Sequence, residues 1–363
     1  MPDSITDALK AFADGQIVVV TDDDDREGEG DLIVAASRCT AEQMAFIIRH
    51  TSGIVCASMT SENARRLRLD PMVTHNDSNH TTAFTISIDY RPGATTGISA
   101  EERAACCRAL ANPNAGASDF IRPGHLFPLV ARDGGVLFRS GHTEAGVDLC
   151  KLAGLPAVGV LSELMNDDGT VMKGQQVHDF ARKHSLKCIT IVDIISYRQA
   201  REKLVERVST LTVETPFGPM QGYAYRSPFD AIYHAAFVYK DIGGGENVLT
   251  RFHLFNIFKD VCFSSLRVIA ALEQFRENGN GVLIFLRDGA AGVPIASLDE
   301  QQSKEANRHR QWREVGLGAQ ILRDLGVRSI RHLTTSTHEY KGLSGFGIEI
   351  VGNEPFREPV WKL

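Results

Sequence analysis

The spacing of apolar residues switches between periods of about two and about 3.6 along the first two hundred positions, which predicts alternating strands and helices. The β-branched apolar runs at residues 17–21 and 32–36 predict two buried strands. This alternation is typical of an α/β fold. Further strands are expected at residues 53–59, 83–89, 136–139, 157–161 and 188–193, and helices at 4–13, 40–50, 62–69, 100–111, 144–153 and 175–184.

A charged helical stretch at residues 194–207 separates this region from a second one. Beyond it, the pattern predicts a strand at 282–286 and a helix at 317–325. Because domains commonly hold ~150 residues, the 363 residues predict two domains, 1–206 and 207–363.

Composition and charge exclude several classes of protein. The formal net charge of −6 argues against nucleic acid as a partner. No apolar run approaches the ~20 residues of a membrane span, and the first residues lack the basic and apolar regions of a secretory signal. The seven cysteines are scattered without a CxxC pair, which favours a reduced cytoplasmic protein and argues against a cysteine-built zinc site.

The stretch DDDDREGEGD (22–31), between the first two predicted strands, holds seven carboxylates, one arginine and two glycines. It fits either a solvated acidic loop or a metal site. Crowded carboxylates repel one another unless a positive charge relieves them, and flanking strands would hold them in place. Mg²⁺ binds one or two carboxylates together with water and substrate oxygens. The glycines Gly28 and Gly30 allow a tight turn and close approach to a ligand.

Three polar residues lie where predicted strands give way to turns. His125 falls in an Arg-Pro-Gly-His turn, His142 in the turn before a helix, and Glu163 at the end of a strand. Chemistry on α/β scaffolds is usually found at such positions. Hydroxyl groups before the helix at 100–111 fit either a bound phosphate or simple capping; they belong to Thr95, Thr96 and Ser99.

Six stretches together carry a family resemblance over residues 1–200: DDDDREGEGD (22–31), HTSGIVC (50–56), TTGIS (95–99), RPGHLFPL (122–129), RSGHTEAGVDL (139–149) and GVLSELMNDDGT (159–170). In this order they resemble 3,4-dihydroxy-2-butanone-4-phosphate (DHBP) synthase of riboflavin biosynthesis. One departure is Gly28, where that family usually carries asparagine.

The resemblance implies a lyase that converts ribulose 5-phosphate to dihydroxybutanone phosphate and formate. It implies Mg²⁺ or Mn²⁺, two ions per site, with Glu27 and His142 as metal ligands. His125 and Glu163 are the implied catalytic pair. The family fold is a compact α/β sandwich that forms a homodimer with the active site at the subunit interface. Substrate contacts are implied for Arg26, Glu27, Asp31, Arg139, Ser140, Gly141, His142, Thr143 and Glu163.

The second half is similar to GTP cyclohydrolase II, through TPFGPMQGYAY (215–225), LTRFHL (249–254), GVLIFLRDG (281–289) and other stretches. That family binds zinc with three cysteines, whereas residues 208–363 contain only Cys262. One cysteine does not build a three-thiolate site. We therefore expect no zinc and an α/β domain without the hydrolase activity.

Three readings of this domain remain open. It is either a structural or regulatory domain, a module that senses GTP without cleaving it, or a rebuilt hydrolase in a bifunctional enzyme.

Overall fold

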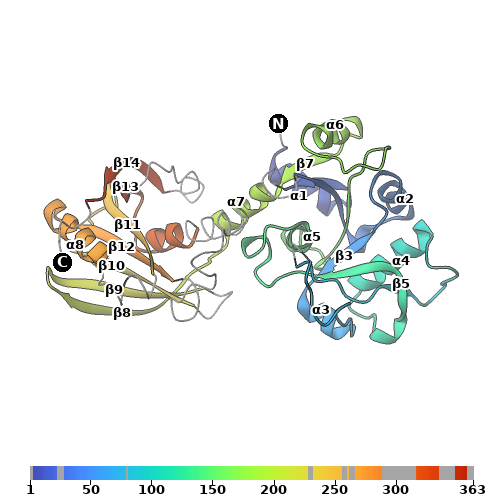
Figure 1. The fold of residues 1–363 in the computed structure, drawn as a ribbon, viewed down its shortest axis with the longest axis horizontal. Coiled ribbons are helices and arrows are strands. Elements are labelled where there is room, and N and C mark those ends of the chain that lie inside the picture. Colours follow the sequence, from blue (N-terminus) through green and yellow to red (C-terminus); the bar gives the residue numbers. More distant parts are fainter. Residues whose placement is uncertain are drawn as a thin grey trace. The chain divides into compact units, whose positions relative to one another are not determined.

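A computed structural model describes residues 3–22, 28–78, 81–227, 232–255, 260, 266–287, 316–334 and 348–357. The chain divides into two compact units, Met1–Tyr197 and Arg198–Leu363 (Figure 1). The division falls within α7 (Ile191–Arg201), which overlaps the helix expected between the domains. Each described unit contains its own mixed sheet, so the predicted α/β class is confirmed.

The described strands of the first unit form one sheet in the order β4-β5-β3-β6-β2-β1-β7. The pairs β1 with β7 and β3 with β5 are parallel, and the other neighbouring pairs in this order are antiparallel. The strands are β1 (Val18–Thr21), β2 (Gly30–Ala35), β3 (Cys56–Met59), β4 (Ile88–Tyr90), β5 (Phe120–Val130), β6 (Val158–Glu163) and β7 (Lys187–Thr190).

Helices cover both faces of this sheet (Figure 1). Leu32 and Val34 of β2 join the core formed with α2 and α4. On the other face α5 lies very close to β6, because a Cβ on Gly159 would be 2.8 Å from the carbonyl oxygen of Gly146. The helices are α1 (Ile5–Ala13), α2 (Ala41–His50), α3 (Ser61–Arg66), α4 (Ala100–Ala111), α5 (His142–Leu152) and α6 (Gln175–Lys183), with short 3₁₀ turns at Ala36–Arg38, Ala117–Asp119 and Gly135–Leu137.

Most elements expected from the sequence are present, but the predicted strand at 136–139 is wrong. Gly135–Leu137 forms a 3₁₀ turn instead. The backbone N–H of Val136 donates to Asp148 Oδ2 at 2.8 Å, and Gly135 has a φ of +63° with no room for a Cβ beside Asp148. A contact with α5 therefore overrides the local apolar pattern. The strand expected at 83–89 is shorter than predicted, because only Ile88–Tyr90 forms a regular strand.

The expected turn at residues 122–125 is also wrong, because these residues lie within β5. The turn-like sequence of residues 122–125 nevertheless reflects an irregularity in the backbone of the strand. The β4–β5 pairing moves from Ile88↔Leu126 directly to Asp89↔Ile121, which leaves residues 122–125 without partners on β4. They form a large bulge inside a continuous strand, a device that redirects side chains beside functional sites.

The described strands of the second unit form a sheet in the order β14-β13-β11-β12-β10-β9-β8. Leu249 and Leu283 of this sheet pack with Phe275 of α8. The predicted strand at 282–286 lies within β12, and the helix predicted at 317–325 is present at 316–324. The elements are β8 (Glu206–Thr215), β9 (Gly218–Arg226), β10 (Tyr233–Tyr239), β11 (Val248–Phe255), α8 (Leu266–Asn278), β12 (Gly281–Arg287), β13 (Ser329–Thr334) and β14 (Glu349–Pro355).

Within the described ranges of both units, the helices are too short or too polar to traverse a lipid bilayer.

Candidate functional site

The two ends of the acidic stretch are held by the strands that flank it. Thr21 of β1 pairs with Gly30 of β2, and the N–H of Glu29 donates to Asp22 Oδ1 at 2.9 Å. Asp22 is 8% exposed, so this end is not a solvated loop. Arg26 and Glu27, which are predicted to contact the substrate or the metal, lie outside the described part of the chain.

Asp31 and His142 come together where β2 begins and α5 starts. His142 is the first residue of α5, whereas the sequence placed it in a turn. Its Nδ1 lies 3.6 Å from Asp31 Oδ1, and both side chains are almost fully buried. Its Nε2 lies 3.1 Å from the carbonyl oxygen of Val20. Because a carbonyl only accepts, Nε2 carries a ring proton, and Nδ1 is the nitrogen that faces Asp31.

This arrangement fits a hard divalent cation better than a soft one. A metal-binding histidine usually donates its other N–H to a carbonyl or carboxylate, as His142 does toward Val20. The neighbouring donors are carboxylate oxygens rather than thiolates, which suits Mg²⁺ or Mn²⁺. The described residues contain no group of three or more histidine, cysteine or acidic side chains placed to hold a metal ion, and the predicted ligand Glu27 is not among the described residues.

Glu163 lies directly beside Asp31 on the sheet, because the β2–β6 register pairs these two residues. Side chains paired across strands point to the same face, so Glu163 shares the face of Asp31. Its Oε2 accepts a hydrogen bond from Ser52 Oγ at 3.0 Å. The prediction that Glu163 ends a strand is confirmed.

His125 joins Asp31 and Glu163 in a row of polar residues at one end of the sheet. Cys56 of β3 pairs with Leu161 of β6 on one side and with Phe127 of β5 on the other. His125 lies two residues before Phe127, and Glu163 lies two residues after Leu161, so both lie toward the N-terminal end of β3. Because neighbouring strands lie ~4.8 Å apart, β5 and β6 on either side of β3 are roughly 10 Å apart.

The His125 ring is held by Asp89, a residue that the sequence did not indicate. Nδ1 of His125 lies 2.9 Å from Asp89 Oδ2, and the backbone N–H of His125 donates to Asp89 Oδ1 at 2.8 Å. The His125 side chain is 44% exposed and that of Asp89 is 12% exposed. Nothing in the sequence marks Asp89, since 36 positions separate the pair.

Arg139 lies beside the start of α5. Its guanidinium donates to Glu144 Oε2 at 2.7 Å and to Thr82 Oγ1 at 3.2 Å. Glu144 is 1% exposed, so a buried carboxylate fixes the arginine. A Cβ on Gly141 would be only 2.2 Å from Arg139 Nη1, which explains the glycine. Ser140, Gly141 and Thr143 lie in the same segment, and α5 has no side-chain cap.

The hydroxyls of the TTGIS stretch make capping contacts. Ser99 Oγ accepts the N–H of Glu102 as the N-cap of α4. In return Glu102 accepts hydrogen bonds from the backbone of Thr95, from Ser99 Oγ and from the backbone of Gly97, which lower its pKa to about 2. The sequence left a bound phosphate and helix capping as alternatives for these hydroxyls, and the structure shows capping.

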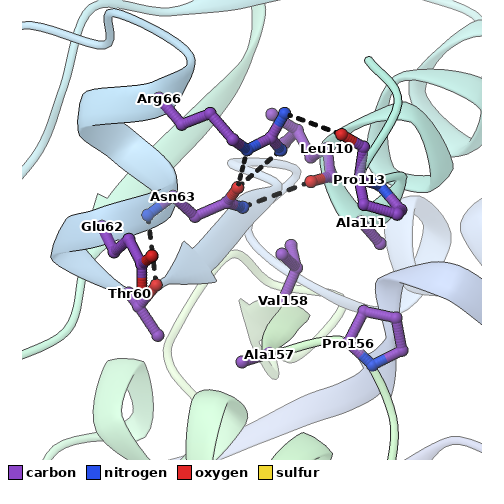
Figure 2. A pocket seen from close by; sticks show the side chains of 10 residues that line it. All are labelled: Thr60, Glu62, Asn63, Arg66, Leu110, Ala111, Pro113, Pro156, Ala157 and Val158. Atoms are coloured by element: carbon purple, nitrogen blue, oxygen red, sulfur yellow. Dashed lines mark hydrogen bonds between the residues drawn. The ribbon is translucent and has the colours of Figure 1, made fainter. Parts of the chain in front are cut away.

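A pocket of about 340 Å³ lies at the opposite end of β3 and β6 from this row, where Met59 pairs with Val158 (Figure 2). Its polar side chains bind one another and nearby carbonyls. Asn63 donates to the carbonyl of Leu110 at 3.2 Å, and Arg66 Nε donates to Asn63 Oδ1 at 3.1 Å. None of the residues predicted to act in catalysis lines it.

The first unit places a row of carboxylate and imidazole groups on an α/β scaffold, an arrangement typical of an enzyme active site. Comparison with protein families gives two matches: 3,4-dihydroxy-2-butanone 4-phosphate synthase over residues 6–197 and GTP cyclohydrolase II over residues 206–355. The chain belongs to the 3,4-dihydroxy-2-butanone 4-phosphate synthase family and carries a GTP cyclohydrolase II-type second domain. Its first domain is thus an enzyme of riboflavin biosynthesis.

Relatives cover both domains. A probable bifunctional riboflavin biosynthesis protein of Oryza sativa subsp. japonica, RIBA 1, named as chloroplastic, is 43% identical over 98% of this chain and 70% of its own length. The crystal structure of RibBX, a two-domain 3,4-dihydroxy-2-butanone 4-phosphate synthase from A. baumannii, is 35% identical over 96% of this chain and 99% of that one, with a TM-score of 0.81. A 3,4-dihydroxy-2-butanone 4-phosphate synthase in complex with two magnesium ions is 48% identical over 55% of this chain and 98% of that one, with a TM-score of 0.54.

Proposed function

We propose that residues 1–206 convert D-ribulose 5-phosphate to L-3,4-dihydroxy-2-butanone 4-phosphate and formate with the residues of the sheet row. The observation that carries this proposal is the alignment of Asp31 and Glu163 on paired strands, with His142 beside Asp31. The reaction must remove a proton from a carbon next to a ketone, and it develops negative charge on oxygen.

Glu27 and His142 are the proposed ligands of two Mg²⁺ or Mn²⁺ ions. The support is the contact of His142 Nε2 with the Val20 carbonyl and the carboxylate of Asp31 next to its Nδ1. The relative with two magnesium ions supports the choice of metal. When bound, the metal supplies Lewis-acid stabilisation of the developing oxyanion.

Glu163 and His125 are the proposed proton-transfer groups. Ser52 donates to Glu163 Oε2 and fixes the carboxylate, while Asp89 fixes the His125 ring. Fixed acid–base groups of this kind typically contribute 10²–10⁴-fold to rate.

Arg139 and the amides that open α5 are proposed to hold the substrate phosphate, together with contacts from Arg26, Asp31, Ser140, Gly141 and Thr143. Arg139 is positioned by Glu144, and the start of α5 lacks a side-chain cap. Amides at a helix start and a neighbouring arginine suit a phosphate group.

We further propose a homodimer that shares its active sites. His125 and Glu163 lie on β5 and β6, on either side of β3, and the roughly 10 Å between these strands is long for two groups acting on one small substrate. A site completed by the partner subunit relieves this difficulty, since His125 is 44% exposed.

Mixed dimers test this sharing. A dimer of one His125→Ala subunit and one Glu163→Gln subunit should regain up to half of the normal activity, because one of its two sites contains both intact residues. No recovery in a heterodimer shown to have formed would place both residues on one chain.

For the second domain we propose a structural or regulatory role without zinc-dependent GTP hydrolysis. Cys262 lies outside the described residues. In the described part of this domain, His253 lies 3.1 Å from Asp260, and both side chains are buried. The bifunctional relative keeps the hydrolase alternative open for testing. Metal analysis finding about one zinc per chain, lost on Cys262→Ser, together with formate release from GTP, would contradict the proposal. Calorimetric binding of GTP without turnover would favour the sensing module.

A further inference from the structure

We propose that Asp89 is a positioning residue for the reaction, which fixes the tautomer of His125 so that Nε2 is the proton-accepting atom. This inference rests on the acid–base role proposed for His125.

The bulge in β5 creates the need for such a residue. Residues 122–125 have no backbone partners on β4, so their donors must find other acceptors. Two side chains of the neighbouring chain segment supply them. Ser87 Oγ accepts the N–H of Gly124 at 3.2 Å, and Asp89 Oδ1 accepts the N–H of His125 at 2.8 Å.

Asp89 does more than replace a backbone acceptor, because its second oxygen reaches the ring. Asp89 Oδ2 lies 2.9 Å from His125 Nδ1. A carboxylate accepts and does not donate, so Nδ1 carries a proton, and in the neutral ring the lone pair is on Nε2. A base must present a lone pair to the proton that it removes.

The backbone of Gly97 lies close to the carboxylate of Asp89. Gly97, in the TTGIS stretch, has a φ of +80°, and a Cβ there would be 2.1 Å from Asp89 Oδ2. The glycine therefore lets this loop lie directly over the carboxylate. Asp89 is only 8% exposed, so its two oxygens keep their two partners.

Asp89→Asn is a direct test. The fixed backbone N–H of His125 requires the amide oxygen, so the NH₂ group of the new side chain faces Nδ1. The ring proton must then move to Nε2. We expect kcat to fall by about 100-fold or more with KM within about twofold, as for a misplaced tautomer in an acid–base pair. ¹⁵N NMR of the ring nitrogens, assigned by their loss in His125→Ala, should change from the Nδ1–H to the Nε2–H pattern.

Two controls separate positioning from a merely structural role. Ser87→Ala removes the neighbouring bond to the bulge and should leave both kcat and the His125 tautomer unchanged. In the His125→Ala background, Asp89→Asn should cause no further loss of kcat, since residues that act through one another are not additive.

Three results would overturn the proposal. The first is an Nε2–H tautomer of His125 in the unaltered enzyme. The second is an Asp89→Asn variant whose kcat and His125 tautomer are both normal. The third is a loss of kcat on Asp89→Asn that is as large in the His125→Ala background as in the unaltered enzyme. The NMR measurement on the unaltered enzyme requires no turnover. It therefore tests the proposal even if the Asp89→Asn variant fails to fold. Absence of activity in the unaltered enzyme alongside the Nδ1–H tautomer would therefore reject the proposed function and keep the positioning of the ring.

Discussion

The two residues proposed to transfer protons are held by partners from distant parts of the chain. Ser52 binds Glu163 across 111 positions, and Asp89 binds His125 across 36. Family motifs indicated the residues proposed to react, but they gave no role to Ser52 or Asp89, because only the folded sheet brings these two to their partners. Glu144 was also missed, although it lies in the same segment as its partner Arg139.

The proposed acid–base pair gives a prediction at this scale. Glu163→Gln and His125→Ala should each lower kcat by about 10²–10⁴-fold, as expected when a general acid–base group is lost. Both residues lie on strands at exposed positions, so circular dichroism and the melting temperature should stay near those of the unaltered protein. Two variants with near-normal turnover would show that the catalytic assignment is wrong.

Local periodicity predicted most elements of the first unit, and failed where a contact between elements decided the backbone. The capping box that opens α2 at Thr40 could be read from the sequence. The 3₁₀ turn at Gly135–Leu137 could not, since it depends on Asp148 of α5. The Arg-Pro-Gly-His sequence in β5 predicted a turn. The register with β4 shows that these residues form a bulge inside a continuous strand.

The bulge also supplies a prediction at the scale of elements. A Cβ on Gly124 would lie 2.0 Å from the backbone carbon of Ile88, and neither strand can move freely. Gly124→Ala should therefore destabilise the protein by about 1–3 kcal/mol, the usual cost of overpacking, and lower activity by displacing His125. Chemical denaturation measures the first effect.

Gly352 of β14 offers a matched control, because a Cβ there would meet nothing within 4 Å. Gly352→Ala should leave both stability and activity unchanged within about 0.5 kcal/mol. Equal stability of the Gly124→Ala and Gly352→Ala variants would contradict the account of the bulge.

At the scale of the molecule, each unit has its own sheet and core, so the two can respond differently to conditions. The second unit buries His332, which is 1% exposed. Burial, with a smaller contribution from the charge of Arg251, lowers the pKa of His332 to about 4. Burial also lowers the pKa of His253, against the opposing effect of Asp260.

These shifts predict that the second unit loses stability in mild acid. Below the ordinary histidine pKa of about 6.5, His332 is protonated in the unfolded state. In the folded state it stays neutral until the pH falls to about 4. The free energy of unfolding should therefore fall as the pH drops from 7, by about 2 kcal/mol at pH 5 for His332 alone. Both tryptophans, Trp312 and Trp361, belong to this half, so their fluorescence in urea titrations follows its unfolding.

His332→Phe keeps a ring against Phe252, whose centroid lies 5.6 Å away, and removes the titrating nitrogens. The pH dependence of unfolding should become shallower in this variant. An identical dependence with and without His332 would assign the acid sensitivity to other groups.

The central claim, a metal-dependent DHBP synthase in the first domain, is tested most directly by formate release from ribulose 5-phosphate by the purified full-length chain. The account predicts formate in step with substrate consumption, loss of turnover after exhaustive treatment with EDTA, and recovery on adding Mg²⁺. His142→Ala should not recover with added metal. Absence of formate, or undiminished turnover after complete chelation, would contradict it.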